Sequence, residues 1–159
     1  MELRHPGQVP ADAAISSLAA WSPWLSFDDA AISAARLPGV YLAQEGRTAA
    51  LSTLGMAGER RGQGLRGRLA VYRRGKAAAS GLGEAVLDRA LADPGFVQEH
   101  FDDLLAGQSK RAAAWAQDAL RLADLHIRWA VTADRPAAVA LERAVLDALA
   151  ASPLWNGAR

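Results

Sequence analysis

The sequence predicts a mixed α/β (α+β) fold, in which a small three-stranded, mainly antiparallel sheet is flanked by helices and interrupted by a helical insertion. Two short apolar runs, residues 37–43 and 48–54, are joined by a short connection that contains glycine, which is the pattern of a β-hairpin. A third run, residues 126–132, alternates and is rich in β-favouring residues, which indicates another strand. The stretch between about 75 and 124 has apolar spacing typical of helices instead, and no convincing strand.

Composition favours one ordinary globular domain. The chain has 159 residues, of which 51% are hydrophobic, so it can bury a sizeable core. Cysteine is absent, which excludes disulfides, thiolate metal sites and cysteine nucleophiles. The first residues have no apolar signal core and no run approaches membrane-spanning length, so we expect a soluble, cytoplasmic protein that does not bind a membrane.

Residues 1–36 are predicted to form an N-terminal arm and helices that pack on the core. A short alanine-rich helix is expected over 11–20. A second helix is expected to begin at the capping residue Ser26, which is followed by two acids, and to end before Pro38. Three aromatic side chains lie between these helices or at the start of the second. They are the side chains of Trp21, Trp24 and Phe27. We expect them to pack on the core and not to stack on DNA, because each ring buries much area.

A glycine-rich, basic loop over 55–64 is expected to lead from the hairpin into a helix over 65–72. Arg68 and Tyr72 lie one helical turn apart, so both can point at one bound group. Seven basic residues and only one acid, Glu59, fall between Met56 and Lys76. Such a cluster suits a phosphate backbone, although a solvated loop gives the same pattern equally well.

The second half of the chain is expected to be mainly helical. Helices are predicted over 84–92, 96–105 and 109–124 from their apolar faces. After the third strand, a helix is predicted over 137–150, and Pro136 in its first turn is compatible with a helix start. The acids around His100 suggest no metal cluster, and we expect this histidine to face solvent.

Five sequence segments share an order with a known family. They are Gly39-Val40-Tyr41, Thr53-Leu54-Gly55, Arg68 to Tyr72, Ala138 to Glu142, and Leu154-Trp155-Asn156. This order resembles the GIY-YIG nuclease superfamily, with its two tripeptides on the hairpin, an arginine on the next helix, a late glutamate and a closing asparagine. The resemblance implies a GIY-YIG-like domain over 37–159, with the helical insertion at about 75–124.

The resemblance implies a metal-dependent endonuclease that hydrolyses DNA phosphodiester bonds. Arg68 would hold the scissile phosphate, because a guanidinium matches phosphate geometry and stays charged. Tyr41, with Tyr72 nearby, would orient or deprotonate the water. Glu142 would hold Mg²⁺ or Mn²⁺, which suit a carboxylate and several waters. The expected substrate-binding residues are Gly39, Gly55, Arg60, Arg61, Arg66, Arg73 and Asn156.

One departure from the family pattern keeps alternatives open. Thr53 stands where most relatives have a tyrosine, so a catalytically weak or inactive nucleic-acid-binding module is the second hypothesis. A helical protein–protein adaptor, or oligomerisation through the insertion, is a third hypothesis.

Asp88 also resembles the catalytic acid, but Glu142 is favoured because it follows a predicted strand. Residues 62–67 fit G-x-G-x-x-G without the required strand before them, so no nucleotide cofactor is expected.

Overall fold

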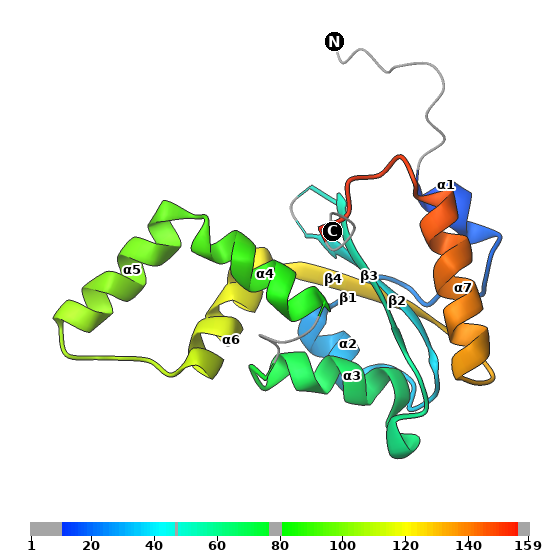
Figure 1. The fold of residues 1–159 in the computed structure, drawn as a ribbon, viewed down its shortest axis with the longest axis horizontal. Coiled ribbons are helices and arrows are strands. Elements are labelled where there is room, and N and C mark those ends of the chain that lie inside the picture. The colour runs from blue at the N-terminus through cyan, green and yellow to red at the C-terminus, as the bar shows by residue number, and fades with distance from the viewer. Residues whose placement is uncertain (1–10, 47, 77–80, 156–159) are drawn as a thin grey trace, which may run out of the picture.

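The computed structural model describes residues 11–46, 48–76 and 81–155. In these ranges a four-stranded antiparallel sheet lies between helices on both faces (Figure 1). The strands are β1 (Leu25–Ser26), β2 (Gly39–Glu45), β3 (Leu51–Ala57) and β4 (Leu125–Val131), in the order β1-β4-β2-β3. The predicted α/β class is confirmed, with four strands in place of three. The additional strand, β1, has only two residues, which is too few for hydrophobic periodicity to indicate a strand.

The register of the hairpin places the expected tripeptides side by side. Tyr41 pairs with Gly55 across β2 and β3, and Ala43 pairs with Thr53. The predicted basic loop was wrong at its start, because residues 55–57 continue β3 up to the partner of Gly39. Strand β2 also pairs with β4 along its whole length, with Tyr41 opposite Trp129. Tyr41 therefore lies on a central strand, whereas β3 is an outer strand.

The predicted helices are present, with shifted ends. Ser26 caps the second helix through a bond from the Asp29 amide, as expected, but that helix ends at Ser33. The described helices are α1 (Ala11–Ser16), α2 (Phe27–Ser33), α3 (Gly64–Arg73), α4 (Gly81–Leu91), α5 (Pro94–Leu105), α6 (Ala112–Ala123) and α7 (Arg135–Ala148), and a short 3₁₀ turn, η1, spans Arg60–Gly62.

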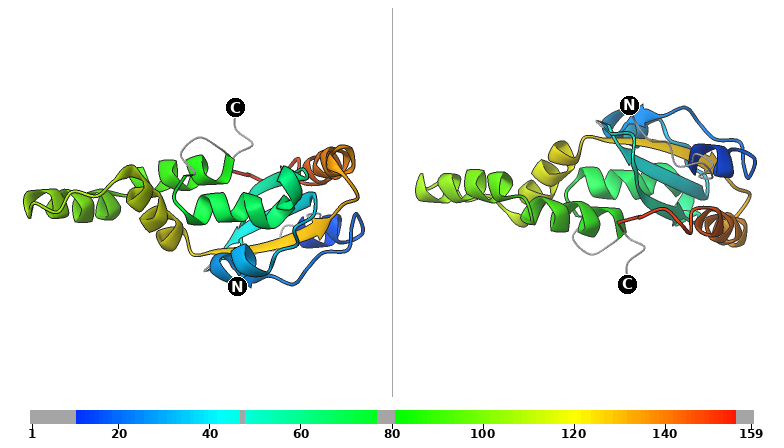
Figure 2. Two further views of the ribbon diagram at one scale, coloured as in Figure 1. Left: turned by 90° about the horizontal axis from the view of Figure 1, so that it is seen from below. Right: turned by 90° about the horizontal axis from the view of Figure 1, so that it is seen from above.

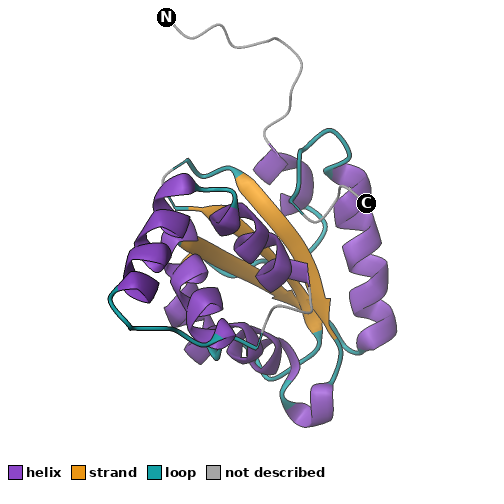
Figure 3. Ribbon diagram, turned by 60° about the vertical axis from the view of Figure 1, so that its left-hand side comes forward, coloured by secondary structure: helices purple, strands orange, loops and turns teal. Residues whose placement is uncertain are grey.

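Alternation along the strands divides the core into two clusters. Tyr41 and Ala43 face a cluster with residues of α2, α3, α4 and α6. Val40 and Leu42 face the opposite cluster, which includes Val145 of α7. Figure 3 shows the sheet between these helical layers. Most of the helices, including α3, thus cover one face, and α7 and α1 cover the other.

The N-terminal aromatic residues pack on the core, as predicted. Trp21 and Trp24 are half-buried against the α7-side cluster, and Phe27 is buried in the other cluster. The two tryptophan rings also hold the buried Arg128 of β4, whose guanidinium carbon lies 5.0 Å and 5.1 Å from their centroids. Cation–π contacts of this kind stabilise a buried guanidinium.

Helices α4, α5 and α6 form the insertion, and α5 lies farthest from the sheet (Figures 1 and 2). His100 of α5 is buried, so its predicted solvent exposure was wrong. Its ring lies 4.0 Å from the ring of Trp115 and 4.2 Å from that of Phe96, and its Nε2 lies 3.0 Å from a carboxylate oxygen of Asp118. Trp115 and Asp118 belong to α6, so His100 joins the two helices. No helix in the described ranges is long and apolar enough to cross a membrane.

Candidate active site

Two buried phenols form the centre of the candidate site. Tyr41 comes from β2 and Tyr72 from α3, and their hydroxyl oxygens lie 3.2 Å apart in a hydrogen bond. Their side chains are 1% and 0% exposed. The chain has only two tyrosines, and the fold brings both into contact.

Gly55 makes room for this pair. A Cβ at residue 55 would collide with the Tyr41 ring and hydroxyl, because the phenol lies across its strand partner. The glycine is therefore required by the close approach of an aromatic ring. Its predicted role in substrate binding stays a prediction.

Arg68 lies beside both phenols. Its guanidinium carbon is 5.3 Å from the centroid of the Tyr72 ring, one helical turn away. Its Nε atom is buried and has no hydrogen-bond partner among the described residues. Buried donors are normally satisfied, so this nitrogen is suited to an acceptor that enters from outside the chain.

The pKa of Tyr41 is raised well above its ordinary value. Burial is the largest cause, and the neighbouring Tyr72 adds to it, whereas the positive charge of Arg68 acts in the opposite direction. Tyr41 therefore stays protonated at neutral pH. In this environment it can orient a water by hydrogen bonding, but it is a poor proton acceptor.

Glu142 is near the same arginine. Burial raises the pKa of its half-buried carboxyl, and the positive charge of Arg68 partly opposes that rise. Arg68 and Glu142 come from helices on opposite faces of the sheet, and both helices pack against β3. The phenol pair faces the α3 side of the sheet, so Glu142 lies on the opposite face from Tyr41 and Tyr72. The competing acid, Asp88, is exposed on α4.

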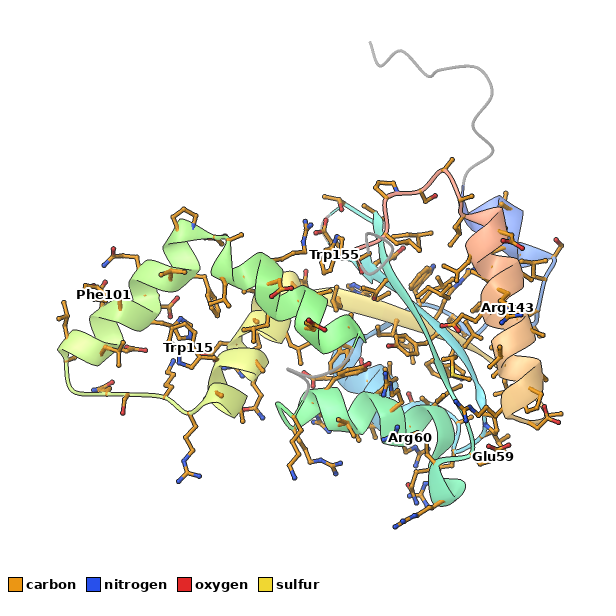
Figure 4. The ribbon with its side chains drawn as sticks, in the orientation of Figure 1. Glu59, Arg60, Phe101, Trp115, Arg143 and Trp155 are labelled. Atoms are coloured by element: carbon orange, nitrogen blue, oxygen red, sulfur yellow. The ribbon has the colours of Figure 1, made fainter. Side chains whose placement is uncertain are left out.

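The predicted substrate-binding residues fall into different environments. Arg60 and Arg61 are exposed in the turn before α3, and Figure 4 shows Arg60 beside that helix. Arg66 donates from Nε to the carbonyl of Ala34, 2.8 Å away, and therefore braces α3 against α2. Among the remaining candidates, Arg73 pairs with Asp28, Gly39 lies tightly against the backbone of Ala130, and Asn156 lies outside the described residues.

Thr53 does not replace the expected aromatic residue. Its side chain is fully buried and its hydroxyl has no hydrogen-bond partner among the described residues. It shares the face of Tyr41, because Ala43, its partner in β2, lies two residues from Tyr41. A threonine hydroxyl is not a base, so this position offers only hydrogen bonding.

Sequence reasoning missed the contact that joins the turn before α3 to α7. The Glu59 carboxylate accepts the backbone N–H of Arg135 at 3.0 Å. The available sequence signal was the Asp134-Arg135-Pro136 helix start, which needs acceptors for its first amides. Nothing in that pattern indicates an acceptor from a residue so distant in sequence.

The residues that could hold a metal ion are few. In the described ranges, no group of three or more histidine, cysteine, aspartate or glutamate side chains is arranged to bind one. Glu142 is the carboxylate whose pKa the charge of Arg68 affects, but it belongs to the helix that covers the sheet face opposite to the phenols. Comparison of the chain with protein-family models, with curated proteins and with solved structures found no match.

Proposed function

We propose that the protein is a cytoplasmic, metal-dependent endonuclease that hydrolyses DNA phosphodiester bonds. The observation that carries the proposal is the buried pair of Tyr41 and Tyr72 with the guanidinium of Arg68 beside it. Arg68 is also close enough to Glu142, on the helix of the opposite face, to affect the pKa of its carboxyl. The order of these residues along the chain, and the pairing of Tyr41 with Gly55, support the resemblance to GIY-YIG nucleases.

In the proposed reaction, Arg68 holds the scissile phosphate and offsets the negative charge that develops on its oxygens. The protonated Tyr41 and its partner Tyr72 hold the attacking water by hydrogen bonding. The water oxygen forms a bond to phosphorus as the bond to the 3′ oxygen breaks. One proton of the water passes, through solvent, to the departing oxygen.

A single divalent cation fits this donor set. Mg²⁺ and Mn²⁺ favour oxygen ligands and keep several waters, so one carboxylate is sufficient to bind them weakly. Glu142 would hold the ion, and the ion would supply Lewis-acid stabilisation of the leaving oxygen. A positive ion would also favour the ionised carboxylate, which burial alone disfavours.

The test is an incubation of purified protein with supercoiled plasmid and with single-stranded circles, with and without Mn²⁺ or Mg²⁺. We expect nicking that needs the metal and falls by about two orders of magnitude or more in Arg68→Ala and Glu142→Ala. Arg111→Gln, at the exposed start of α6, is the control and should keep wild-type activity. Equal nicking by wild type and Glu142→Ala would contradict the proposal.

A second function is a nucleic-acid-binding module without hydrolysis. The favouring observation is that Tyr41, Tyr72 and Thr53 are all closed to solvent, so an attacking water reaches the phenols only if the site opens. Such a module should bind DNA with strong salt dependence in EDTA and should release no nicked product with any metal. Filter binding and the plasmid assay, run on one preparation, separate the two functions.

A further inference from the structure

The turn before α3 is attached to the start of α7 by one carboxylate. Glu59 Oε1 accepts the N–H of Arg135, the first residue of α7, at 3.0 Å. Asp134 caps the same helix through the amide of Ala137 at 2.8 Å. Helix starts have amides without partners inside the helix and favour negative charge. Glu59 therefore satisfies a donor that Asp134 leaves without an acceptor.

The backbone of the turn continues this attachment. Gly58 lies directly against the Arg135 side chain, where a Cβ would come within 3.2–3.3 Å of its carbon atoms. The carbonyl of Glu59 accepts the amides of Gly62 and Gly64 at 2.9 Å and 3.1 Å. One residue thus bonds both to α7 and to the first residue of α3.

The other side of the turn is fixed to the segment between α2 and β2. At the start of α3, the amides of Leu65 and Arg66 donate to the carbonyls of Leu37 and Ala35, at 2.9 Å and 3.0 Å. These carbonyls belong to the segment between α2 and β2. The start of α3 therefore cannot move with the turn unless these bonds break.

The turn itself is strained. Arg60 and Arg61 have φ values of +46° and +54°, in the left-handed region that non-glycine residues rarely adopt. Strain of this kind persists only where surrounding contacts hold it. Glu59, together with the packing of Gly58 on Arg135, holds this turn at its α7 end.

We propose that Glu59 is a positioning residue, which links the start of α3 to the start of α7 and thereby sets the approach of Arg68 to Glu142. Arg68 lies about one turn into α3 and Glu142 about two turns into α7, on the usual rise per residue. Figure 4 shows Glu59 between these two helices. The inference rests on the proposed function for its catalytic consequence, but its structural part can be tested alone.

The variants are Glu59→Ala, which removes the acceptor, and Glu59→Gln, whose amide oxygen can accept the same N–H. Asp93→Ala is the matched control. Asp93 caps α5 through the amides of Gly95 and Phe96, so its loss also removes a carboxylate from a helix start, far from the site. Because the chain has no cysteine, spin labels at Arg74→Cys and Asp147→Cys, both exposed, report the separation of α3 from α7.

We expect the distribution of distances between the two labels to be broader or shifted in Glu59→Ala. Glu59→Gln and Asp93→Ala should both show the wild-type distribution. In the plasmid assay, the Mn²⁺ concentration for half-maximal nicking should rise about tenfold in Glu59→Ala only, the low end of effects seen when groups that support metal ligands are removed.

An unchanged label distance in Glu59→Ala overturns the proposal, and so does an unchanged Mn²⁺ dependence in an active protein. If the wild type neither nicks DNA nor binds Mn²⁺, the proposed function fails. The link between α3 and α7 is then decided by the label distance alone.

Discussion

At the scale of single residues, the buried phenol pair sets the proton chemistry of the site. Each hydroxyl carries one proton, yet the two oxygens share one hydrogen bond. One proton of the pair is therefore left over for another acceptor. An incoming phosphate oxygen or water could accept it, which gives Tyr41 and Tyr72 a role as donors that does not require a phenolate.

The first prediction concerns the pKa of Tyr41 in the variant Tyr72→Phe. Only one tyrosine then remains, so the ultraviolet absorbance of the phenolate reports Tyr41 alone. Loss of the Tyr72 hydroxyl should lower the pKa of Tyr41, but it should stay above the ordinary value because burial is the larger cause. Unfolding in denaturant should return it to about 10. Titration of the folded variant at the ordinary value would contradict the buried position.

The second prediction concerns how the partly buried carboxylate of Glu142 affects the free energy of unfolding. Burial raises the pKa of its carboxyl in the folded chain, so between the unfolded and folded pKa values the native state binds more protons than the unfolded state. The free energy of unfolding of the wild type therefore falls as pH rises through that window.

Glu142→Gln removes this cost, so the variant should be more stable than the wild type at neutral pH. The advantage should shrink as the pH falls towards the unfolded pKa of about 4.3. Thermal unfolding across this pH range measures the difference. Asp147→Asn, on an exposed residue of the same helix, is the control and should show little gain. A Glu142→Gln variant less stable than the wild type at pH 7 would contradict the prediction.

At the scale of elements, α5 depends on a small number of contacts with the rest of the insertion. His100 stacks between Phe96 and Trp115 and contacts Asp118. Lys110, in the connection between α5 and α6, also bonds to Asp118 at 3.1 Å. Four other apolar side chains of α5 are at least 40% exposed and do not hold it to the body: Val97, Phe101, Leu104 and Leu105.

The third prediction is that His100→Ala loosens α5 selectively. The substitution leaves a cavity between aromatic rings and removes a partner of Asp118, at a cost of about 1–3 kcal/mol. Amide hydrogen exchange should accelerate in α5 and α6 but not in β2, because local opening involves the least-packed elements first. Glu99→Gln, at an exposed neighbour, should leave exchange unchanged. Uniform acceleration across the sheet would show that α5 is not a separate unit.

Elements were predicted better than the contacts between them. Hydrophobic spacing and turn residues indicated the hairpin, β4 and α7, because these features are local. The two-residue β1 was missed because it exists only through pairing with β4. His100 was misplaced because its burial depends on Trp115, fifteen positions later. Likewise, the nearness of Arg68, Tyr41 and Tyr72 was expected, whereas the link from Glu59 to α7 is a tertiary contact without a local signature.

At the scale of the whole molecule, charge is separated between two regions. Residues 56–76 contain seven basic residues and one acidic residue, whereas residues 81–124 contain eight acidic and four basic ones. The basic region includes α3 and the turn before it, and the acidic region forms the insertion, which projects away from the sheet (Figure 1). An anionic polymer is attracted to the first region and repelled by the second, so DNA should approach from the side of α3.

The last prediction follows from this separation. Arg60 and Arg61 are exposed, and no ion pair is seen for either within the described ranges. Each is therefore free to bind a phosphate. The double variant Arg60→Gln/Arg61→Gln should bind duplex DNA more weakly, and the slope of log affinity against log salt concentration should decrease by about 0.9 for each phosphate that is no longer neutralised. Arg111→Gln removes one positive charge from the acidic insertion and should leave the slope unchanged.

Fluorescence anisotropy at several salt concentrations, in EDTA so that no cleavage occurs, gives the slopes. Equal slopes for wild type and the double variant would place the DNA elsewhere on the molecule, whereas a change for Arg111→Gln alone would move it to the insertion.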